Sequence, residues 1–248
     1  MNKMKIQTKG LIILLLFVAV VAIFFYLMPT EYPLTGFIIK LRSQKLLAYL
    51  IIAVAASFST ISFQTITENQ FLTPSILGLD ALYVLMQTVY LFFANQFIGK
   101  ISNPLFEFII ILSIQCGFFL CLQPMIKKLL QQGFVFILLI CMALGTLFRS
   151  TSTFLQVLMD PNEYDKLQTK LFPSFQRMNM EIVLIATVII GLVSLYVLKK
   201  NAVLNVFRLD KKTAMILGIE VEKEQKKLLW AIVLLTSSTT ALAGPMMF

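Results

Sequence analysis

Residues 181–198 read EIVLIATVIIGLVSLYVL, residues 199–227 read KKNAVLNVFRLDKKTAMILGIEVEKEQKK, and residues 228–244 read LLWAIVLLTSSTTALAG. The two outer runs are apolar and each is about as long as a helix needs to be to cross a bilayer. The run between them carries eight Lys or Arg and four Asp or Glu. We expect two membrane-spanning helices joined by a charged loop that contacts something soluble.

Five further apolar runs extend the same pattern over the rest of the chain. Of the 248 residues, 58% are hydrophobic, whereas soluble domains contain about 45–50% apolar residues. The runs are continuous rather than alternating, which favours helices over a β-barrel. We therefore predict an all-α, polytopic membrane helical bundle, one domain over residues 1–248, with about seven transmembrane helices. The spans are expected at 11–28, 46–64, 79–98, 104–123, 134–149, 181–198 and 228–244.

The distribution of Lys and Arg predicts the orientation. An inside N-terminus gives thirteen basic residues on the inner side and eight on the outer side, as the positive-inside rule prefers. No small-x-small cleavage pattern follows Met28, so we interpret residues 11–28 as a retained first span rather than a signal peptide. Lys40, Arg42 and Lys45 fall on the disfavoured side. The segment Leu41-Arg42-Ser43-Gln44-Lys45 carries either interfacial snorkelling cations or a patch that docks an acidic surface.

The composition excludes several classes of function. The chain contains no His, which rules out His-based zinc or haem sites and a His-based hydrolase triad. The three Cys lie in apolar runs without a CxxC pair and are expected to be small buried hydrophobes. The basic charge indicates topology rather than nucleic-acid binding. We predict no enzymatic activity, no cofactor and no metal site.

The spans are predicted to hold charges only near their ends, where Asp80, Glu107 and Glu181 lie. Ion-coupled transporters usually place ionisable groups at mid-membrane. The pattern therefore disfavours a stand-alone ion-coupled carrier and favours a pathway of small and hydroxyl residues with energy supplied by another protein.

Three shorter segments carry local signals. Asp160-Pro161-Asn162-Glu163 is typical of a helix start, and we expect a short amphipathic helix at the outer surface. Residues 210–218 are predicted to form a capped helix in which Asp210 is the N-cap, Ala214 and Leu217 share a face, and Gly218 takes the left-handed position after the end. In residues 69–78, Pro74 and Gly78 predict a tight turn.

Four blocks, in order along the chain, carry a family resemblance. Leu41-Arg42-x-x-Lys45-Leu46-Leu47-Ala48 resembles LRxPRxLAA, residues 69–78 resemble NPLAxPxLLG, Leu204-Asn205 with residues 209–218 resembles LN…LGxxxAxxLG, and residues 243–248 resemble AGPIxF. The chain is identified as similar, over about residues 10 to 248, to the FecCD-type permeases of bacterial ATP-binding-cassette importers for iron–siderophore complexes, haem and cobalamin. The sequences of residues 207–219 and 238–248 are most similar to those of Gram-positive ferric-catecholate siderophore permeases.

The resemblance implies a function and a set of partners. The chain would be the permease subunit that moves a ferric siderophore or related chelate across the bacterial cytoplasmic membrane. Its partners would be an ATP-binding-cassette ATPase subunit, an extracytoplasmic substrate-binding (lipo)protein, and a second permease copy or a paralogue. The resemblance assigns binding-protein docking to Arg42 and Lys45; coupling to the ATPase to Leu209, Asp210, Ala214, Leu217 and Gly218; a motif turn to Asn69, Pro74 and Gly78; and the pathway lining to Gly145 and Thr146.

The chain departs from the family pattern in three places and in length. Gln70 stands where the family has Pro, Lys45 replaces an Arg, and Asp210-Lys211-Lys212 replaces Gly-Glu-Glu. Family members have about ten spans and continue past the block at 243–248, so the chain is interpreted as C-terminally truncated. The alternative function is therefore a non-transporting membrane protein that retains its partner-binding surfaces. The sequence does not identify the chelate, because chelate specificity is expected to reside largely in the binding protein.

Overall fold

The computed structural model describes residues 2–28, 36–93, 104–132, 134–172, 179–209 and 211–245. All the regular elements in these ranges are helices, which confirms the predicted all-α fold class. They are α1 (Asn2–Leu27), α2 (Gly36–Thr67), the short 3₁₀ helix η1 (Pro74–Leu77), α3 (Leu79–Phe93), α4 (Pro104–Gln132), α5 (Phe134–Val157), α6 (Pro161–Leu171), α7 (Met180–Lys199), α8 (Asn201–Phe207), α9 (Lys211–Ile216) and α10 (Val221–Ala243).

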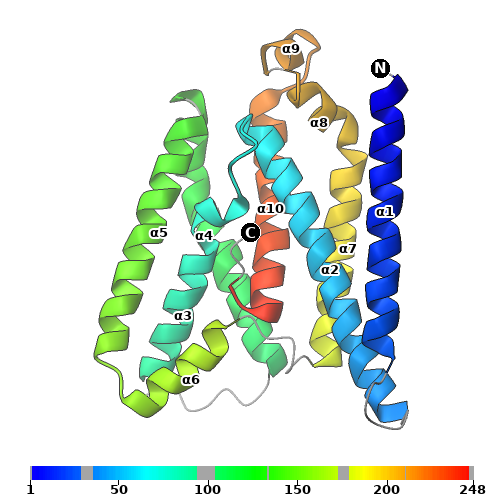
Figure 1. Ribbon diagram of the computed structural model, residues 1–248. Coiled ribbons are helices and arrows are strands. Elements are labelled where there is room, and N and C mark those ends of the chain that lie inside the picture. Colours follow the sequence, from blue (N-terminus) through cyan, green and yellow to red (C-terminus); the bar gives the residue numbers. More distant parts are fainter. Residues whose placement is uncertain are drawn as a thin grey trace. The chain divides into compact units, whose positions relative to one another are not determined.

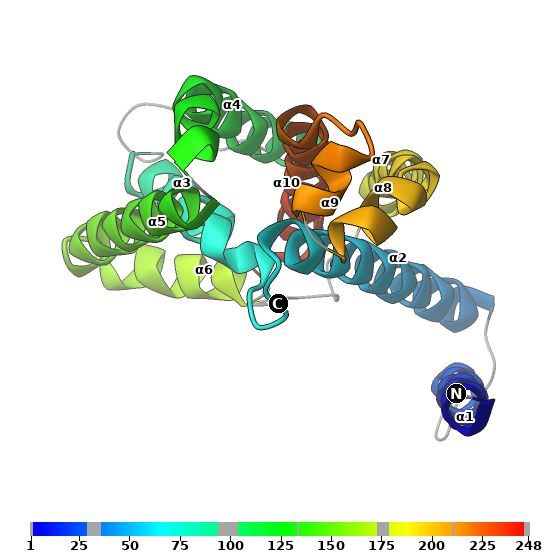
Figure 2. The ribbon, with the colours of Figure 1, turned by 90° about the horizontal axis from the view of Figure 1, so that it is seen from above.

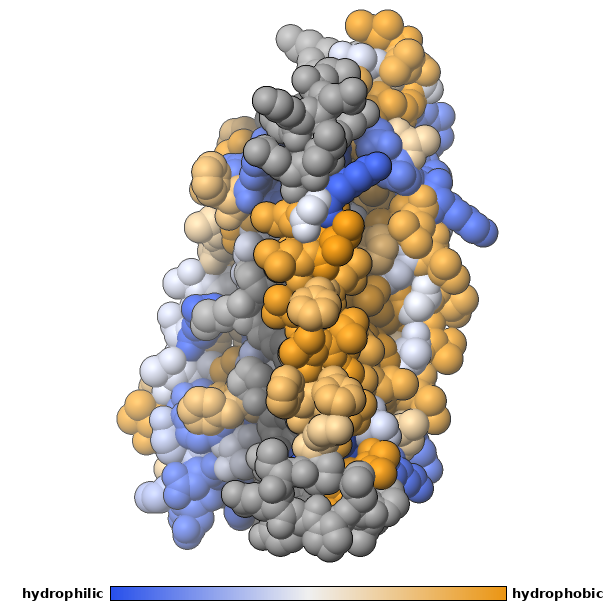
Figure 3. Space-filling view, turned by 45° about the vertical axis from the view of Figure 1, so that its right-hand side comes forward, coloured by the Kyte–Doolittle hydropathy of each residue, from blue (hydrophilic) through white to orange (hydrophobic). Residues whose placement is uncertain are grey.

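The seven predicted spans fall on α1, α2, α3, α4, α5, α7 and α10, except that residues 94–98 of the third predicted span lie outside the described residues. Among the described residues, five helices contain stretches long and apolar enough to cross a membrane, namely those in α1, α2, α4, α5 and α7. α3 is apolar but shorter, and α10 is interrupted by hydroxyl side chains. On the face in Figure 3, apolar side chains gather along the middle of the helices and hydrophilic ones toward their ends. The chain is a multi-pass membrane protein.

The helices extend beyond the predicted runs. α2 begins at Gly36 rather than at residue 46, so Arg42 and Lys45 lie within the helix and not in a segment before it. α5 continues to Val157, which places Arg149 inside an apolar stretch of 23 residues, 135–157. The expectation that spans carry charge only near their ends is therefore wrong for α5. The helix continues past Arg149, and Thr153 Oγ1 donates to the Arg149 carbonyl at 2.9 Å, so this hydroxyl is satisfied within the helix.

The chain divides into two compact units, Met1–Leu50 and Ile51–Phe248. In the first unit, the guanidinium of Arg42 donates to the carbonyl oxygens of Tyr26 and Met28 at 2.9 and 3.0 Å. These carbonyls belong to the last turn and end of α1, where intrahelical donors run out. Arg42 thus ties α1 to the start of α2. The prediction of a single permease domain over residues 1–248 stays a prediction.

In the second unit, α10 is the central helix. The view down the bundle in Figure 2 shows α10 between α4 and α7. Leu228, Leu229 and Ile232 are fully buried in the main apolar core, and the ring of Trp230 meets Phe119 of α4 edge-on at 5.0 Å between centroids. The hydroxyl-rich residues 236–240 are buried as well. α10 is thus packed by protein along most of its length, so its hydroxyl groups do not face lipid.

The two ends of this unit carry different short helices. α8 and α9 lie at one end of the bundle and α6 lies at the other (Figure 1). α6 begins as predicted, because the Asp160 carboxylate accepts the Asn162 amide at 3.0 Å and Pro161 occupies the first turn. Its placement at the outer surface of a membrane stays a prediction.

Candidate functional site

The loop between α7 and α10 is an ordered projection anchored in the core. Leu204 and Phe207 of α8 and Ala214 of α9 are buried in the same apolar core as Val221 and Leu228 of α10. These buried side chains hold the loop by packing, although the segment is rich in charge.

Gly218 ends α9 in the predicted conformation. Its φ is +79°, its amide donates to the Met215 carbonyl at 3.0 Å, and the Ile219 amide donates to the Ala214 carbonyl at 3.0 Å. These two bonds form a Schellman motif. No atom lies within 4 Å of the position of a Cβ at Gly218, so glycine is favoured there by the backbone conformation and not by space.

Two other expectations for this helix have different outcomes. The predicted shared face of Ala214 and Leu217 is wrong: Ala214 is fully buried, whereas Leu217 is 61% exposed. Leu217 lies just past Ile216, the last residue of α9, and its amide donates to the Thr213 carbonyl at 3.1 Å. Asp210 lies outside the described residues, and its predicted role as an N-cap stays a prediction.

The exposed side of α9 carries an apolar cluster that we call the α9 cluster: Leu209, Met215, Ile216 and Leu217. Their exposed fractions are 74%, 60%, 84% and 61%. Sequence reasoning missed Met215 and Ile216. The signal was the run Met215-Ile216-Leu217 within a loop that is otherwise highly charged, because an apolar run on a polar projection marks an interaction surface.

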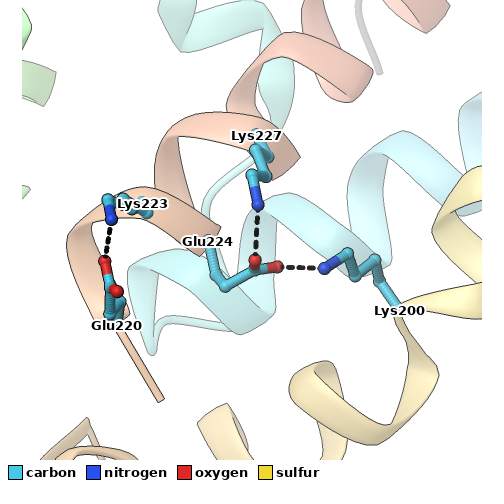
Figure 4. A network of polar contacts seen from close by, with 5 residues as sticks. All are labelled: Lys200, Glu220, Lys223, Glu224 and Lys227. Atoms are coloured by element: carbon cyan, nitrogen blue, oxygen red, sulfur yellow. Dashed lines mark hydrogen bonds and ion pairs between the residues drawn. The ribbon is translucent and has the colours of Figure 1, made fainter.

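An ion-pair network braces the base of this projection (Figure 4). Glu224 of α10 pairs with Lys200, between α7 and α8, at 2.7 Å and with Lys227 at 2.9 Å. Burial raises the pKa of Glu224, but the hydrogen bonds and charges of Lys200 and Lys227 outweigh it and hold the pKa below its ordinary value. The network joins the end of α7 to the start of α10 across the loop.

Glu224→Gln is expected to lower the free energy of unfolding by about 1–2 kcal/mol at neutral pH, because it breaks a partly buried pair and leaves Lys200 without its counter-charge. The lowered pKa of Glu224 means that its stabilisation is complete above the ordinary pKa of a glutamate and is lost as pH falls through the lowered value. The difference between wild type and variant should therefore vanish in acid. Thermal unfolding in micelles from pH 7 to 3 measures it.

The matched control is Glu220→Gln. Glu220 pairs with Lys223 at 2.5 Å, but both side chains are well exposed, at 65% and 71%. This change should cost at most about 0.5 kcal/mol. Equal losses for the two variants, or a difference that persists in acid, would contradict a bracing role for Glu224.

The motif turn at residues 69–78 is built by local hydrogen bonds. Asn69 Oδ1 accepts the Phe71 amide at 2.9 Å, and Gln64 Nε2 of α2 donates to the Gln70 carbonyl at 2.7 Å. Pro74 opens η1, where a missing N–H is tolerated, and Gly78 ends it with φ +76°. Pro74 and Gly78 thus bound the short helix η1, and the functional role of this motif turn stays a prediction.

Gly78 also brings the turn against α5. A Cβ at Gly78 would lie 3.3 Å from the Cys141 carbonyl oxygen and 3.3 Å from the Gly145 Cα, and a Cβ at Gly145 would lie 3.4 Å from the Gly78 Cα. The two glycines therefore allow the backbones of η1 and α5 to touch. The structure thus brings Gly145 together with Gly78, a contact that the sequence did not predict.

A hollow of about 250 Å³ opens beside this contact. It is lined by Ser75, Ile76, Gly78, Ala81, Met142, Gly145, Thr146 and Arg149. Gly145 and Thr146, expected to line a pathway, and Gly78 of the motif turn therefore share one site, whereas Asn69 and Pro74 are not part of its lining. The role of this hollow in transport stays a prediction.

Arg149 is the functional candidate that sequence reasoning missed in this hollow. It is exposed and lies in the part of α5 that is apolar and long enough to cross a membrane. An Arg at the centre of a lipid-facing helix costs about 2.5–3.5 kcal/mol on insertion scales, so this face of α5 is unsuited to lipid. The signal was the spacing of Thr146, Arg149 and Thr153, which share one helical face.

Among the contacts that the structure describes for Arg42 and Lys45, none identifies a partner protein, and Arg42 is engaged with the end of α1. Within the described residues, no group of three His, Cys, Asp or Glu side chains lies close enough to hold a metal ion.

Comparison with known proteins places these features in a family. The model of the FecCD transport family matches residues 10–248. The chain is 40% identical over 207 residues to the petrobactin import system permease protein YclO of Bacillus subtilis (strain 168), covering 84% of this chain and 66% of the relative. It is 32% identical over 226 residues to the petrobactin import system permease protein FatC of Bacillus anthracis, covering 89% of this chain and 62% of the relative.

A third relative, the iron(3+)-hydroxamate import system permease protein FhuG of Bacillus subtilis (strain 168), is 26% identical and is covered to 62%. The chain thus spans just under two thirds of the length of these curated relatives. A solved inward-facing structure of a metal-chelate type ABC transporter has the same fold, with a TM-score of 0.75 at 22% identity, covering 96% of this chain and 75% of that one. The family match and these relatives confirm the resemblance drawn from the four sequence blocks: the chain belongs to the FecCD transport family.

Proposed function

We propose that this chain is a membrane subunit of an ATP-driven importer that carries a ferric siderophore, or a related iron chelate, across the cytoplasmic membrane of a bacterium. Family membership and the names of the relatives, which are permeases for petrobactin and iron(3+)-hydroxamate import, support the substrate class. The observation that carries the proposal is the α9 cluster, an exposed apolar surface on a braced helical projection. A transport subunit without an energy source of its own needs such a surface.

The α9 cluster is proposed to contact a separate ATPase subunit on the inner side, with the N-terminus of the chain on the same side. Ala214 holds α9 in the core with α10, and Glu224 ties α10 to the end of α7. At the other end of α10, Thr240 Oγ1 donates to Asp80 Oδ1 of α3 at 3.3 Å. A displacement of α9 therefore has a packed route through α10 to the helix that follows the motif turn.

A substrate-binding protein is proposed to dock at Arg42 and Lys45 on the outer side, and a second permease, either a copy or a paralogue, to complete the pathway. Lys45→Glu is expected to weaken binding of that protein by roughly tenfold, since charge pairs at a rim mainly steer association and set its register. Lys40→Glu is the matched control because it reverses a charge on the same helix outside the motif. Affinity is measured by surface-immobilised binding at two salt concentrations.

Equal affinity for wild type and Lys45→Glu, or equal weakening in Lys40→Glu, would refute docking at this position. Arg42 is less suitable for this test because its guanidinium also holds the end of α1. Its substitution would combine a structural effect with any loss of docking.

The proposed function is tested by ATP-dependent uptake of radioactive iron chelates in proteoliposomes. They contain this chain with its ATPase, its second permease and its binding protein. Accumulation that requires both ATP and the binding protein is the expected result. Assembly of the partners without accumulation would instead support the alternative of a non-transporting protein that retains its binding surfaces.

A further inference from the structure

Arg149 places a permanent positive charge on an exposed face of a membrane-spanning helix. It lies close to the middle of α5, and Thr146 and Thr153 flank it on the same face. Both threonine hydroxyls donate to carbonyl oxygens of their own helix, at 2.9 Å each. The polar stripe is therefore compatible with a helix in a membrane, and the guanidinium is its strongest donor.

The charge of Arg149 is not cancelled by a direct ion pair within the described part of the chain. Arg149 interacts electrostatically with the carboxylate of Asp80. Asp80 is 7% exposed and accepts a hydrogen bond from Thr240 of α10, so this carboxylate is bound to the bundle interior. A guanidinium remains charged at all physiological pH values, and a charged side chain within a membrane-spanning segment is expected to face a polar partner or a water-filled cavity.

The hollow beside Arg149 is suited to an anionic group. Its lining includes Ser75 and Thr146 but no carboxylate. The Thr146 hydroxyl donates its proton to a backbone carbonyl of α5. Arg149, with its several N–H groups, is therefore the side chain in the hollow that can donate more than one hydrogen bond to a ligand. Planar guanidinium groups bind carboxylates and similar oxygen pairs in a bidentate manner. At about 250 Å³, the hollow holds part of a chelate, because sites for whole small molecules usually measure about 300–1,000 Å³.

We propose that Arg149 binds an anionic group of the ferric chelate during its passage along α5, and that it favours negatively charged chelates over neutral ones. This proposal rests on the proposed function. Fe³⁺ bound by three catecholates carries net negative charge, whereas Fe³⁺ bound by three hydroxamates is neutral. The positive charge on α5 distinguishes these two classes by electrostatics alone.

The experiment replaces the charge and then restores it chemically. Arg149→Cys is prepared in a chain whose Cys116, Cys121 and Cys141 are changed to Ala, and is assembled into the complete importer in proteoliposomes. Uptake of a radioactive ferric tris-catecholate and a ferric trihydroxamate is measured before and after reaction with a cationic aminoethyl or an anionic sulfonatoethyl methanethiosulfonate. Lys166→Cys in the same background is the control, because Lys166 is an exposed cation on α6 outside the hollow.

We expect Arg149→Cys to reduce tris-catecholate uptake by roughly tenfold, as expected for loss of a charged hydrogen-bonding partner. The cationic reagent should restore it and the anionic reagent should not, with ATPase assembly unchanged. The Lys166→Cys importer should respond to neither reagent.

Wild-type uptake of only the neutral chelate, unreduced uptake by Arg149→Cys, or identical responses to both reagents would overturn the proposal. Loss of subunit assembly in Arg149→Cys would overturn it too, by assigning the residue to a protein interface. An assembled wild type that accumulates neither chelate would instead refute the proposed function itself.

Discussion

Gly78→Ala should destabilise the permease by about 2–4 kcal/mol, and this is the largest stability effect expected of any single methyl group in the described chain. A left-handed backbone costs a non-glycine residue about 1–2 kcal/mol, and Gly78 has φ +76°. The added Cβ would also lie 3.3 Å from both the Cys141 carbonyl oxygen and the Gly145 Cα. Backbone atoms cannot move aside as a flexible side chain does, so η1 and α5 would be forced apart.

Two control glycines separate the contributions. Gly218→Ala introduces the same backbone strain, with φ +79°, in open space, and should cost only about 1–2 kcal/mol. Gly117→Ala, in the helix α4 and also in open space, should be neutral or slightly stabilising because Ala favours helix. Apparent melting temperatures in micelles provide the measurement. A loss in Gly78→Ala no larger than in Gly218→Ala would show that the contact with α5 is not tight in solution.

The contrast among these glycines shows how far the sequence could predict the site. The capping pattern of residues 210–218 was enough to place Gly218, because a Schellman motif is local and its residues are neighbours in sequence. The close approach of Gly78 to Gly145 involves two segments far apart in the chain. A single sequence offers no signal for such a pairing beyond the presence of a small residue in each segment.

The apolar runs predicted the existence of the helices well and their ends poorly. A run ends where the first charge appears, but a helix ends where its backbone hydrogen bonds can no longer continue. At Arg149 these criteria disagree, because the charge ends the apolar run whereas α5 continues to Val157. Thr151 and Thr153 satisfy their hydroxyl groups on backbone carbonyls of the same helix. The same disagreement hid Arg149 as a charge within a span. For Leu217 the spacing predicted a face shared with Ala214, whereas the structure buries Ala214 and leaves Leu217 61% exposed.

Ile216→Ala combined with Leu217→Ala should lower the affinity for the ATPase subunit by roughly 30- to 1,000-fold, the second large effect expected. Each apolar side chain buried in an interface contributes about 1–2 kcal/mol, and about 1.4 kcal/mol is tenfold in affinity. Ile216 and Leu217 are 84% and 61% exposed and lie beside the Schellman turn, so their removal leaves the packing of Ala214 unchanged. The fold should therefore be preserved while binding is lost, as measured by titration of the purified ATPase subunit against nanodiscs that contain the permease.

The matched control is Leu192→Ala combined with Leu195→Ala on α7, which removes a similar apolar area from side chains that are 65% and 58% exposed. These residues lie on a membrane-spanning helix, so the control should bind the ATPase as tightly as wild type. Equal weakening in both double variants would mean that the loss reflects general destabilisation. Unchanged affinity in the α9 variant would leave the charged residues of the loop as the docking surface and would refute the apolar contact proposed for α9. Because α9 is fixed to α10 through Ala214 and α10 to α7 through Glu224, loss of this one contact should also abolish ATP-dependent uptake, even though the hollow beside Arg149 would be intact.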